Sequence, residues 1–197
     1  GLKTAFKRKD FLLSVAMFFC MLGVFNTFFT MIEPIISSMT KGTVDSTQAG
    51  IIGVIVLVTG VLGSFVLSVI SDKDKLHRRL PYMIVVNIIG TSGLILFMVF
   101  AGFKGMVIAA LIYGFFVVGS APLILTFAAE AAYPTSEGTS EGLLMFSGNV
   151  AGVIMLGAAS FLGGNHMVLM AGLAAVSVIS IVLMFMSKEI KLQNKKL

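Results

Sequence analysis

The sequence predicts an all-α membrane protein, because it is strongly apolar, contains six long uncharged segments and concentrates its basic residues in three places. Of its 197 residues, 57% are hydrophobic and only 12% are charged, with a mean hydropathy of +1.04. Soluble domains carry about 25% charged residues. The 21 glycines agree with helices that pack closely in a bilayer, where small residues let backbones approach one another.

Six segments are long enough to cross a bilayer, which takes about 20 apolar residues per helix. Glu141, at the edge of the fifth segment, is the only Asp, Glu, Lys or Arg inside them. A charge in lipid costs several kcal/mol, so membrane spans are expected to exclude charged side chains. The six predicted spans cover residues 11–32, 48–70, 81–101, 106–129, 141–162 and 166–187.

The basic residues predict an orientation for these spans. Twelve of the fourteen Lys and Arg residues lie before the first span, between the second and third, or after the sixth. With six spans these segments share one side, which the positive-inside rule makes the cytoplasm. We therefore expect a cytoplasmic lead-in of residues 1–10, a membrane domain of residues 11–187 and a cytoplasmic basic tail of residues 188–197. The basic residues then set topology, and no nucleic-acid partner is expected.

The loop between the second and third spans resembles the major facilitator signature G-x-x-x-D-R-x-G-R-R. Asp72 stands at the exit of the second helix, and Arg78 and Arg79 precede the third. The first glycine of the signature is a serine here, and Arg78 follows Asp72 by six residues instead of about four. We expect a cytoplasmic clasp in which these arginines pair with carboxylates, including Glu130 and Glu137 of the next cytoplasmic loop. The alternative is a basic loop that only sets topology.

The loop after the fourth span carries a more specific resemblance. Residues Glu130 to Leu144 read E-x-x-Y-P-x-x-E-G-x-S-x-G-L-L. This pattern is similar to the loop between helices ten and eleven in the feline leukaemia virus subgroup C receptor-related family, a major facilitator branch associated with haem, choline and related amine transport. Weaker resemblance extends over residues 11–160. Pro134 is expected to end the fourth helix, and Thr139 or Ser140 to cap the fifth.

The resemblance implies that the six spans are helices seven to twelve of a twelve-helix transporter in the plasma membrane. Its fold would be one major facilitator half-domain, made of two inverted three-helix repeats over residues 11–101 and 106–187. The implied partners are the lipid bilayer, a small-molecule substrate, and either a missing N-terminal six-helix half or a second copy of the chain. The expected function is transport of a small organic solute by alternating access.

Polar side chains inside the spans are candidate substrate contacts, because a buried amide in lipid needs a hydrogen-bond partner. Asn149 matches the glutamine position that the resemblance ties to substrate binding. Asn26 and Thr30 would line the cavity from the first span, where the resembled family tends to carry an aromatic residue. For both asparagines helix packing is the alternative, with Gly148 and Gly152 as the packing face beside Asn149. For Asn87 we expect a packing role.

The remaining features concern gating and alternative functions. The segment from Gly119 to Pro122 predicts a kink that either serves as a gating hinge or is only tolerated. With Cys20 as its one cysteine, the sequence predicts no metal site and no cofactor. A half-size transporter acting as a homodimer remains an alternative, as does a channel or structural subunit. An intramembrane hydrolase fits poorly, because Ser147 lacks a G-x-S-G setting and His166 lies at the outer end of the last span. We therefore expect no enzyme.

Overall fold

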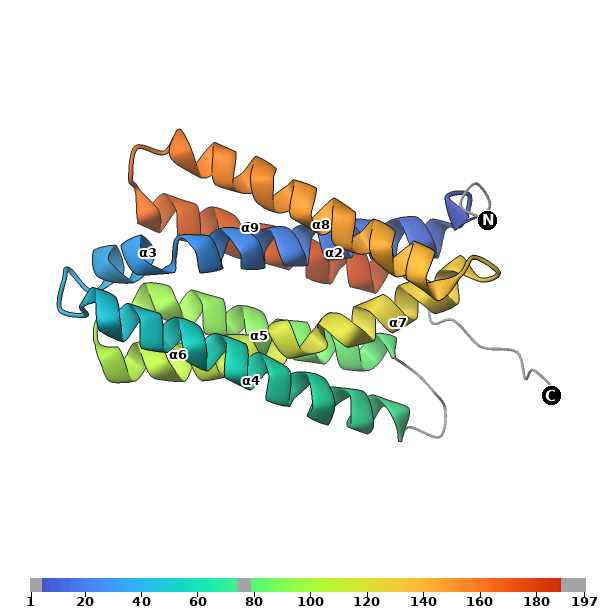
Figure 1. Ribbon diagram of the computed structural model, residues 1–197, viewed down its shortest axis with the longest axis horizontal. Helices are drawn as coiled ribbons and strands as arrows, with labels where there is room; N and C mark the ends of the chain where they lie inside the picture. The colour runs from blue at the N-terminus through green and yellow to red at the C-terminus, as the bar shows by residue number, and fades with distance from the viewer. Residues whose placement is uncertain (1–4, 74–78, 189–197) are drawn as a thin grey trace.

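The computed structural model describes residues 5–73 and 79–188, and the regular structure in these ranges is helical throughout (Figure 1). Within them, six helices are long and apolar enough to cross a membrane, and each lies within a few residues of its predicted span. The expectation of six membrane-spanning helices is thus confirmed. The spans are α2 (Lys9–Thr30), α4 (Ser46–Asp72), α5 (Leu80–Val99), the fourth span α6–η1–α7 (Phe103–Phe116, Val118–Ser120 and Ala121–Ala132), α8 (Glu137–Ser160) and α9 (His166–Met186).

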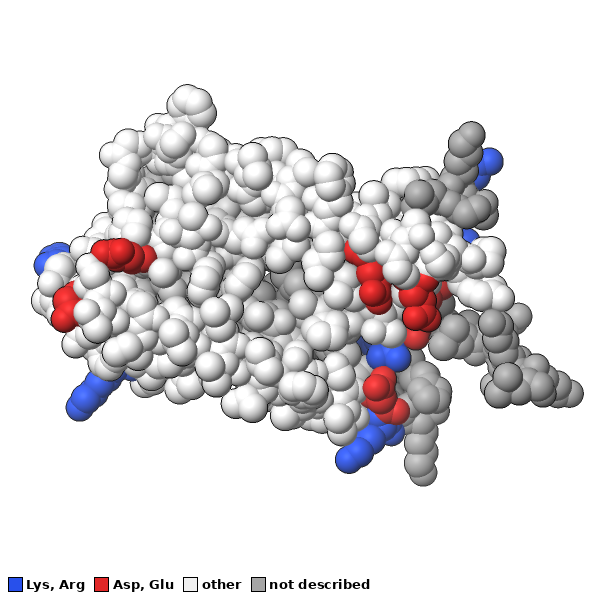
Figure 2. All heavy atoms as spheres, in the orientation of Figure 1, with Lys and Arg blue, Asp and Glu red and all other residues white. Residues whose placement is uncertain are grey.

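Charged side chains lie at the two ends of the bundle. Figure 2 shows Lys, Arg, Asp and Glu gathered at both ends of the visible face, with a broad uncharged band between them. We call the end that carries Lys9 and Met186 the terminal end, and the end that carries Thr30 and His166 the opposite end. The uncharged band is the part that fits the hydrocarbon core of a bilayer.

The helices pack as two inverted three-helix repeats. The first span, α2, packs mainly on α8 and α9, while the fourth span packs mainly on α4 and α5. If spans one, two and three are matched with spans four, five and six, the α2–α8 contact corresponds to the contact of the fourth span with α4. The α2–α9 contact likewise corresponds to the contact of the fourth span with α5. The first and fourth spans run in opposite directions through the bundle, so the two repeats have inverted topology.

One local expectation was wrong, and one helix was not predicted. The segment between the first and second spans forms the helix α3 (Ile32–Met39) directly after Met31. Pro34 permits this because a proline in the first helical turn removes no hydrogen bond. The helix α8 begins four residues earlier than expected, since Ser136 has the extended backbone of an N-cap residue. Thr139 and Ser140 therefore lie inside its first turn and do not cap it. The fourth span ends at Ala132, just before Pro134, as expected.

Glycines bring α4 and the fourth span into backbone contact. A Cβ atom added to Gly63 would lie 2.1 Å from the carbonyl oxygen of Phe115, and one added to Gly114 would lie 2.4 Å from the carbonyl oxygen of Val56. These separations are far below van der Waals contact, so only glycine fits at these positions. Close approach of this kind is the main source of helix association in lipid, where burial of apolar surface contributes little.

The substitution Gly63→Ala is therefore expected to lower the free energy of unfolding by about 1–3 kcal/mol, because the added methyl group overlaps the backbone of Phe115. Thermal unfolding in detergent measures this change. Gly50→Ala on the same helix is the matched control, since a Cβ there meets no atom within 4 Å. Equal losses in the two variants would contradict the close packing.

Candidate functional site

The two candidate asparagines of the membrane interior meet across the α2–α8 contact. The side-chain Nδ2 of Asn26 donates a hydrogen bond to Oδ1 of Asn149 at 3.3 Å. The Nδ2 of Asn149 donates in turn to the backbone carbonyl of Met145 at 2.8 Å, which anchors this amide to its own helix. The sequence did not predict that these two residues would pair, because they are 123 positions apart.

Small residues make this contact possible. A Cβ atom added to Gly152 would lie 2.9 Å from Cβ of Asn26, and one added to Gly148 would lie 2.6 Å from Leu22. On the other helix, a Cβ atom added to Gly23 would lie 2.7 Å from Cβ of Ala151. Gly148 and Gly152 thus form the face of α8 that packs on α2, and the hydrogen bond between the asparagines lies beside this face.

The amide pair lies on the surface of the six-helix unit, away from its core. Asn149 is exposed and Asn26 is half-buried. Asn149 is twelve residues beyond the first residue of the 24-residue helix α8, so it stands near mid-depth, about 18 Å from the helix start at 1.5 Å per residue. An amide at mid-depth is costly when it faces lipid, so this surface is suited to a cavity, a solute or another protein segment.

Thr30 is the last residue of α2, exposed and one turn beyond Asn26 on the same face. Its hydroxyl makes no hydrogen bond with any residue in the described ranges. The structure therefore places it near the amide pair, toward the opposite end, without joining it to the pair.

At the terminal end, Arg79 joins two carboxylates from different elements. Its Nε lies 3.1 Å from Oε1 of Glu130 in α7, and its Nη1 lies 3.0 Å from Oδ1 of Asp72 at the end of α4. The side chains of Arg79 and Glu130 are only 18% and 16% exposed, whereas Asp72 is 61% exposed, so the Glu130 bond is the better shielded of the two. Arg79 thus holds the ends of α4, α5 and α7 together.

Of the other two members of the predicted clasp, Arg78 lies outside the described residues. Glu137 is exposed in the first turn of α8 and forms no ion pair with the part of the chain that the structure describes. Its carboxylate instead suits the positive end of that helix.

Sequence reasoning missed two further contacts at the terminal end. Nη1 of Arg8 donates to the carbonyl of Ala131 at 3.3 Å, near the negative C-terminal end of α7. The backbone N–H of Lys188 donates to Oδ1 of Asp10 at 3.2 Å. A basic residue before the first helix and an acid in its first turn were visible signals, but their partners are more than 120 positions away.

The fourth span is interrupted where the kink was predicted. The 3-10 turn η1 separates α6 from α7, and Pro122 follows in the first turn of α7. Proline has no N–H to continue the α-helical hydrogen bonds across this point. A Cβ added to Gly119 would lie 2.8 Å from the backbone of Gly63, so the break coincides with close contact to α4. Asn87 has the expected packing role, donating to Ser120 of the turn at 3.2 Å.

A double-mutant cycle tests the ion network. Arg79→Gln and Glu130→Gln are expected to show a coupling energy of about 1 kcal/mol in detergent, because the ion pair is mostly buried. The coupling should fall at high salt, since both side chains are still partly exposed to ions in solution. The matched cycle of Arg79→Gln with Glu137→Gln should give no coupling. Unfolding of each variant measures both, and equal coupling in the two cycles would contradict the observed geometry.

Among the described residues, no group of three or more His, Cys, Asp or Glu side chains could hold a metal ion. The amide pair itself offers hydrogen bonding by two neutral side chains.

Known proteins similar to this chain are membrane transporters. The chain is 31% identical over 151 residues to the choline/ethanolamine transporter flvcr2b of Danio rerio, a match covering 75% of this chain and 30% of that protein. It is 32% identical over 152 residues to the choline/ethanolamine transporter FLVCR2 of Homo sapiens, covering 76% and 28%. It is 29% identical over 150 residues to an MFS-type transporter of Caenorhabditis elegans, covering 75% and 25%.

No protein-family model matches the chain. The chain spans less than a third of the length of the relatives it matches, while each match covers about three quarters of the chain itself. Together with the inverted repeats of its fold, these similarities show that the chain belongs to the major facilitator superfamily, in the branch of transporters related to the feline leukaemia virus subgroup C receptor.

Proposed function

We propose that this chain is helices seven to twelve of a major facilitator transporter and forms one wall of a path for a small organic solute. The observation that carries the proposal is the Asn26–Asn149 amide pair, which stands on the outer surface of the six-helix unit within the membrane band. Two amides that faced lipid would carry an energetic cost with no gain. Facing a second six-helix half that encloses a solute, they could form hydrogen bonds with that solute.

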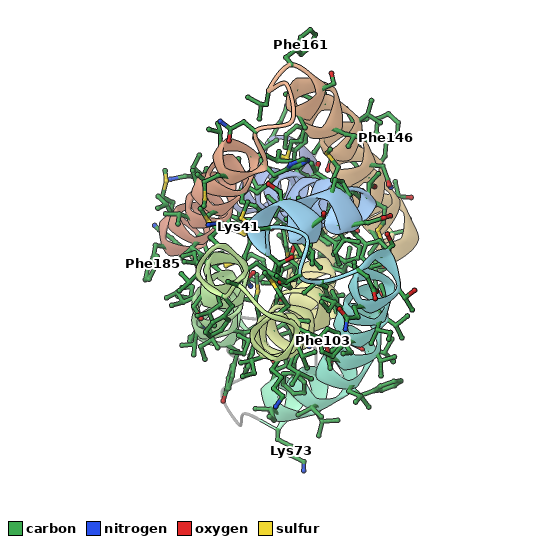
Figure 3. All side chains as sticks on the ribbon, turned by 90° about the vertical axis from the view of Figure 1, so that its left-hand side faces the viewer. Lys41, Lys73, Phe103, Phe146, Phe161 and Phe185 are labelled. Atoms are coloured by element: carbon green, nitrogen blue, oxygen red, sulfur yellow. The ribbon has the colours of Figure 1, made fainter. Side chains whose placement is uncertain are left out.

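The arrangement of the helices supports a second half on one side. Figure 3 looks along the bundle, with α8 and α4 on the right on either side of α2 and α3, and α5 and α9 on the left. The most apolar stretches of α4, α8 and α9 are each buried to only about a third or less, so several helices have a face free for lipid or a partner. The Asn26–Asn149 bond lies between α2 and α8, so we propose that the face made by α2, α4 and α8 meets the other half, and that α5 and α9 on the other side face lipid.

The solute we propose is a small amino alcohol of the kind named for the relatives. Asn26 Oδ1 accepts no hydrogen bond within the described residues and is available to a hydroxyl or ammonium donor. The carboxylates of α8, Glu137 and Glu141, lie at least eight residues or about 12 Å along the helix from Asn149, so this wall supplies dipoles and no counter-charge at the pair. The charge of a cationic solute would then be met by the other half.

Alternating access is the proposed mechanism, with both chain ends in the cytoplasm of a cell whose plasma membrane holds the protein. The network of Arg79, Glu130 and Asp72 would hold the cytoplasmic ends of α4, α5 and α7 as one body. The break at η1 would let α7 tilt relative to α6 as that body moves.

Uptake of radiolabelled choline and ethanolamine by the full-length transporter tests the site. Asn149→Ala and Asn26→Ala are each expected to reduce uptake roughly tenfold, because each removes a hydrogen bond to the solute or the partner that orients it. Ser160→Ala is the control, since this exposed residue lies at the far end of α8 and its hydroxyl donates, among the described residues, only to the carbonyl of Gly157. Unchanged uptake in both asparagine variants at normal surface expression would remove them from the site.

The half-transporter proposal has its own test. The mass of the purified chain in detergent, alone and after co-expression with any six-span segment that the same gene encodes upstream, separates the possibilities. Association with the upstream half supports the proposal. A stable symmetric dimer of the chain alone that moves solute in vesicles would favour a half-size transporter instead.

A further inference from the structure

A small cavity lies inside the bundle at the break in the fourth span. It is about the size of one water molecule. It is lined from α2, α5, α9 and the residue before η1, so it is separate from the exposed amide pair. The lining residues are uncharged: Met21, Val24, Asn87, Thr91, Val117, Ser177 and Ser180.

The amide of Asn87 has one unused atom at this cavity. Its Nδ2 donates to the carbonyl of Met83 at 2.9 Å and to Oγ of Ser120 at 3.2 Å. A carbonyl only accepts, so the atom facing Met83 is the NH2 group. Both donors are therefore used, while Oδ1 accepts no hydrogen bond from the described residues although Asn87 is only 4% exposed.

The hydroxyl groups around the cavity also leave more acceptors than donors unused. Ser177 and Ser180 donate their protons to the carbonyls of Leu173 and Met17, so that their oxygens remain only as acceptors. The Thr91 hydroxyl, on a residue 5% exposed, makes no hydrogen bond with the described chain and keeps its proton available. The cavity thus presents three acceptors and one donor.

We propose that this cavity binds a single ordered water molecule. Water donates two hydrogen bonds and accepts two, so it can donate to Asn87 Oδ1 and to one serine oxygen while it accepts from Thr91. A buried site that supplies two to four polar partners and has room for one molecule meets the usual requirements of an internal water. In a membrane interior such a water hydrates the polar groups beside an interrupted helix. The proposal stands apart from the proposed transport.

A metal cation fits the same site poorly. The lining supplies four neutral oxygens and no carboxylate. A desolvated cation such as Na⁺ would lack both counter-charge and a full set of ligands, and burying an unpaired charge is far more costly than burying a neutral water.

Hydroxyl-radical footprinting by X-ray radiolysis of the full chain in nanodiscs tests the proposal, because radicals form from water and oxidise side chains next to it. Met21 lines the cavity, whereas Met17, one turn earlier on the same helix, is buried and does not. We expect Met21 to be oxidised roughly tenfold faster than Met17, since sulfoxide formation follows access of the oxidant. Equal slow oxidation of the two methionines would show a dry cavity and overturn the proposal.

Two variants and a salt comparison complete the test. Thr91→Val keeps the side-chain volume and removes the one donor that the described lining residues leave unused, so it should bring the oxidation rate of Met21 down toward that of Met17. Thr59→Val on α4, whose hydroxyl bonds within its own helix, should leave the Met21 rate unchanged. Fast Met21 oxidation that persists in Thr91→Val would contradict the site. Suppression of Met21 oxidation by Na⁺ but not by a bulky organic cation would show that the cavity binds a metal ion and not water.

Discussion

Close approach of helix backbones at glycine and alanine positions is the constraint on which the rest of this structure depends. In lipid, apolar side chains gain little by leaving one apolar environment for another, so association relies on contact and on hydrogen bonds between helices. Gly63 and Gly114 bring α4 against the fourth span, and Gly23 and Gly152 bring α2 against α8. The same short separations let asparagine and serine side chains reach across from one helix to the next.

The polar side chains of the membrane interior form two separate groups. Asn87 and Ser120 lie inside the bundle, bonded to each other beside the break, with further hydroxyls around the small cavity. Asn26 and Asn149 lie on the surface of the α2–α8 contact. The first group stabilises the arrangement within one six-helix unit, and the second faces outward from it. This division separates the polar groups that build the unit from those proposed to act on a solute.

The terminal end is held differently, by charge. Arg79 contacts carboxylates from two elements, and Arg8 contacts the last turn of α7. Two of these contacts, at Glu130 and Ala131, are on α7, which is also the segment beyond the break in the fourth span. The helix α7 is bonded to its neighbours at one end and separated from α6 by the 3-10 turn at the other. It can therefore tilt as a rigid body. This geometry links the ion network to the proposed hinge.

The sequence by itself determined the number of spans, their approximate ends and the position of the break, because bilayer thickness and proline chemistry act on short stretches of chain. It also predicted Asp72, Arg79 and Glu130 as members of a clasp, and Asn26 and Asn149 as candidate solute contacts. Only the tertiary structure decided their partners: Arg79 contacts Glu130 and leaves Glu137 aside, and the two asparagines bond to each other. It also decided that α3 is helical. Pairing depends on which faces of distant helices meet, and no local pattern encodes that choice.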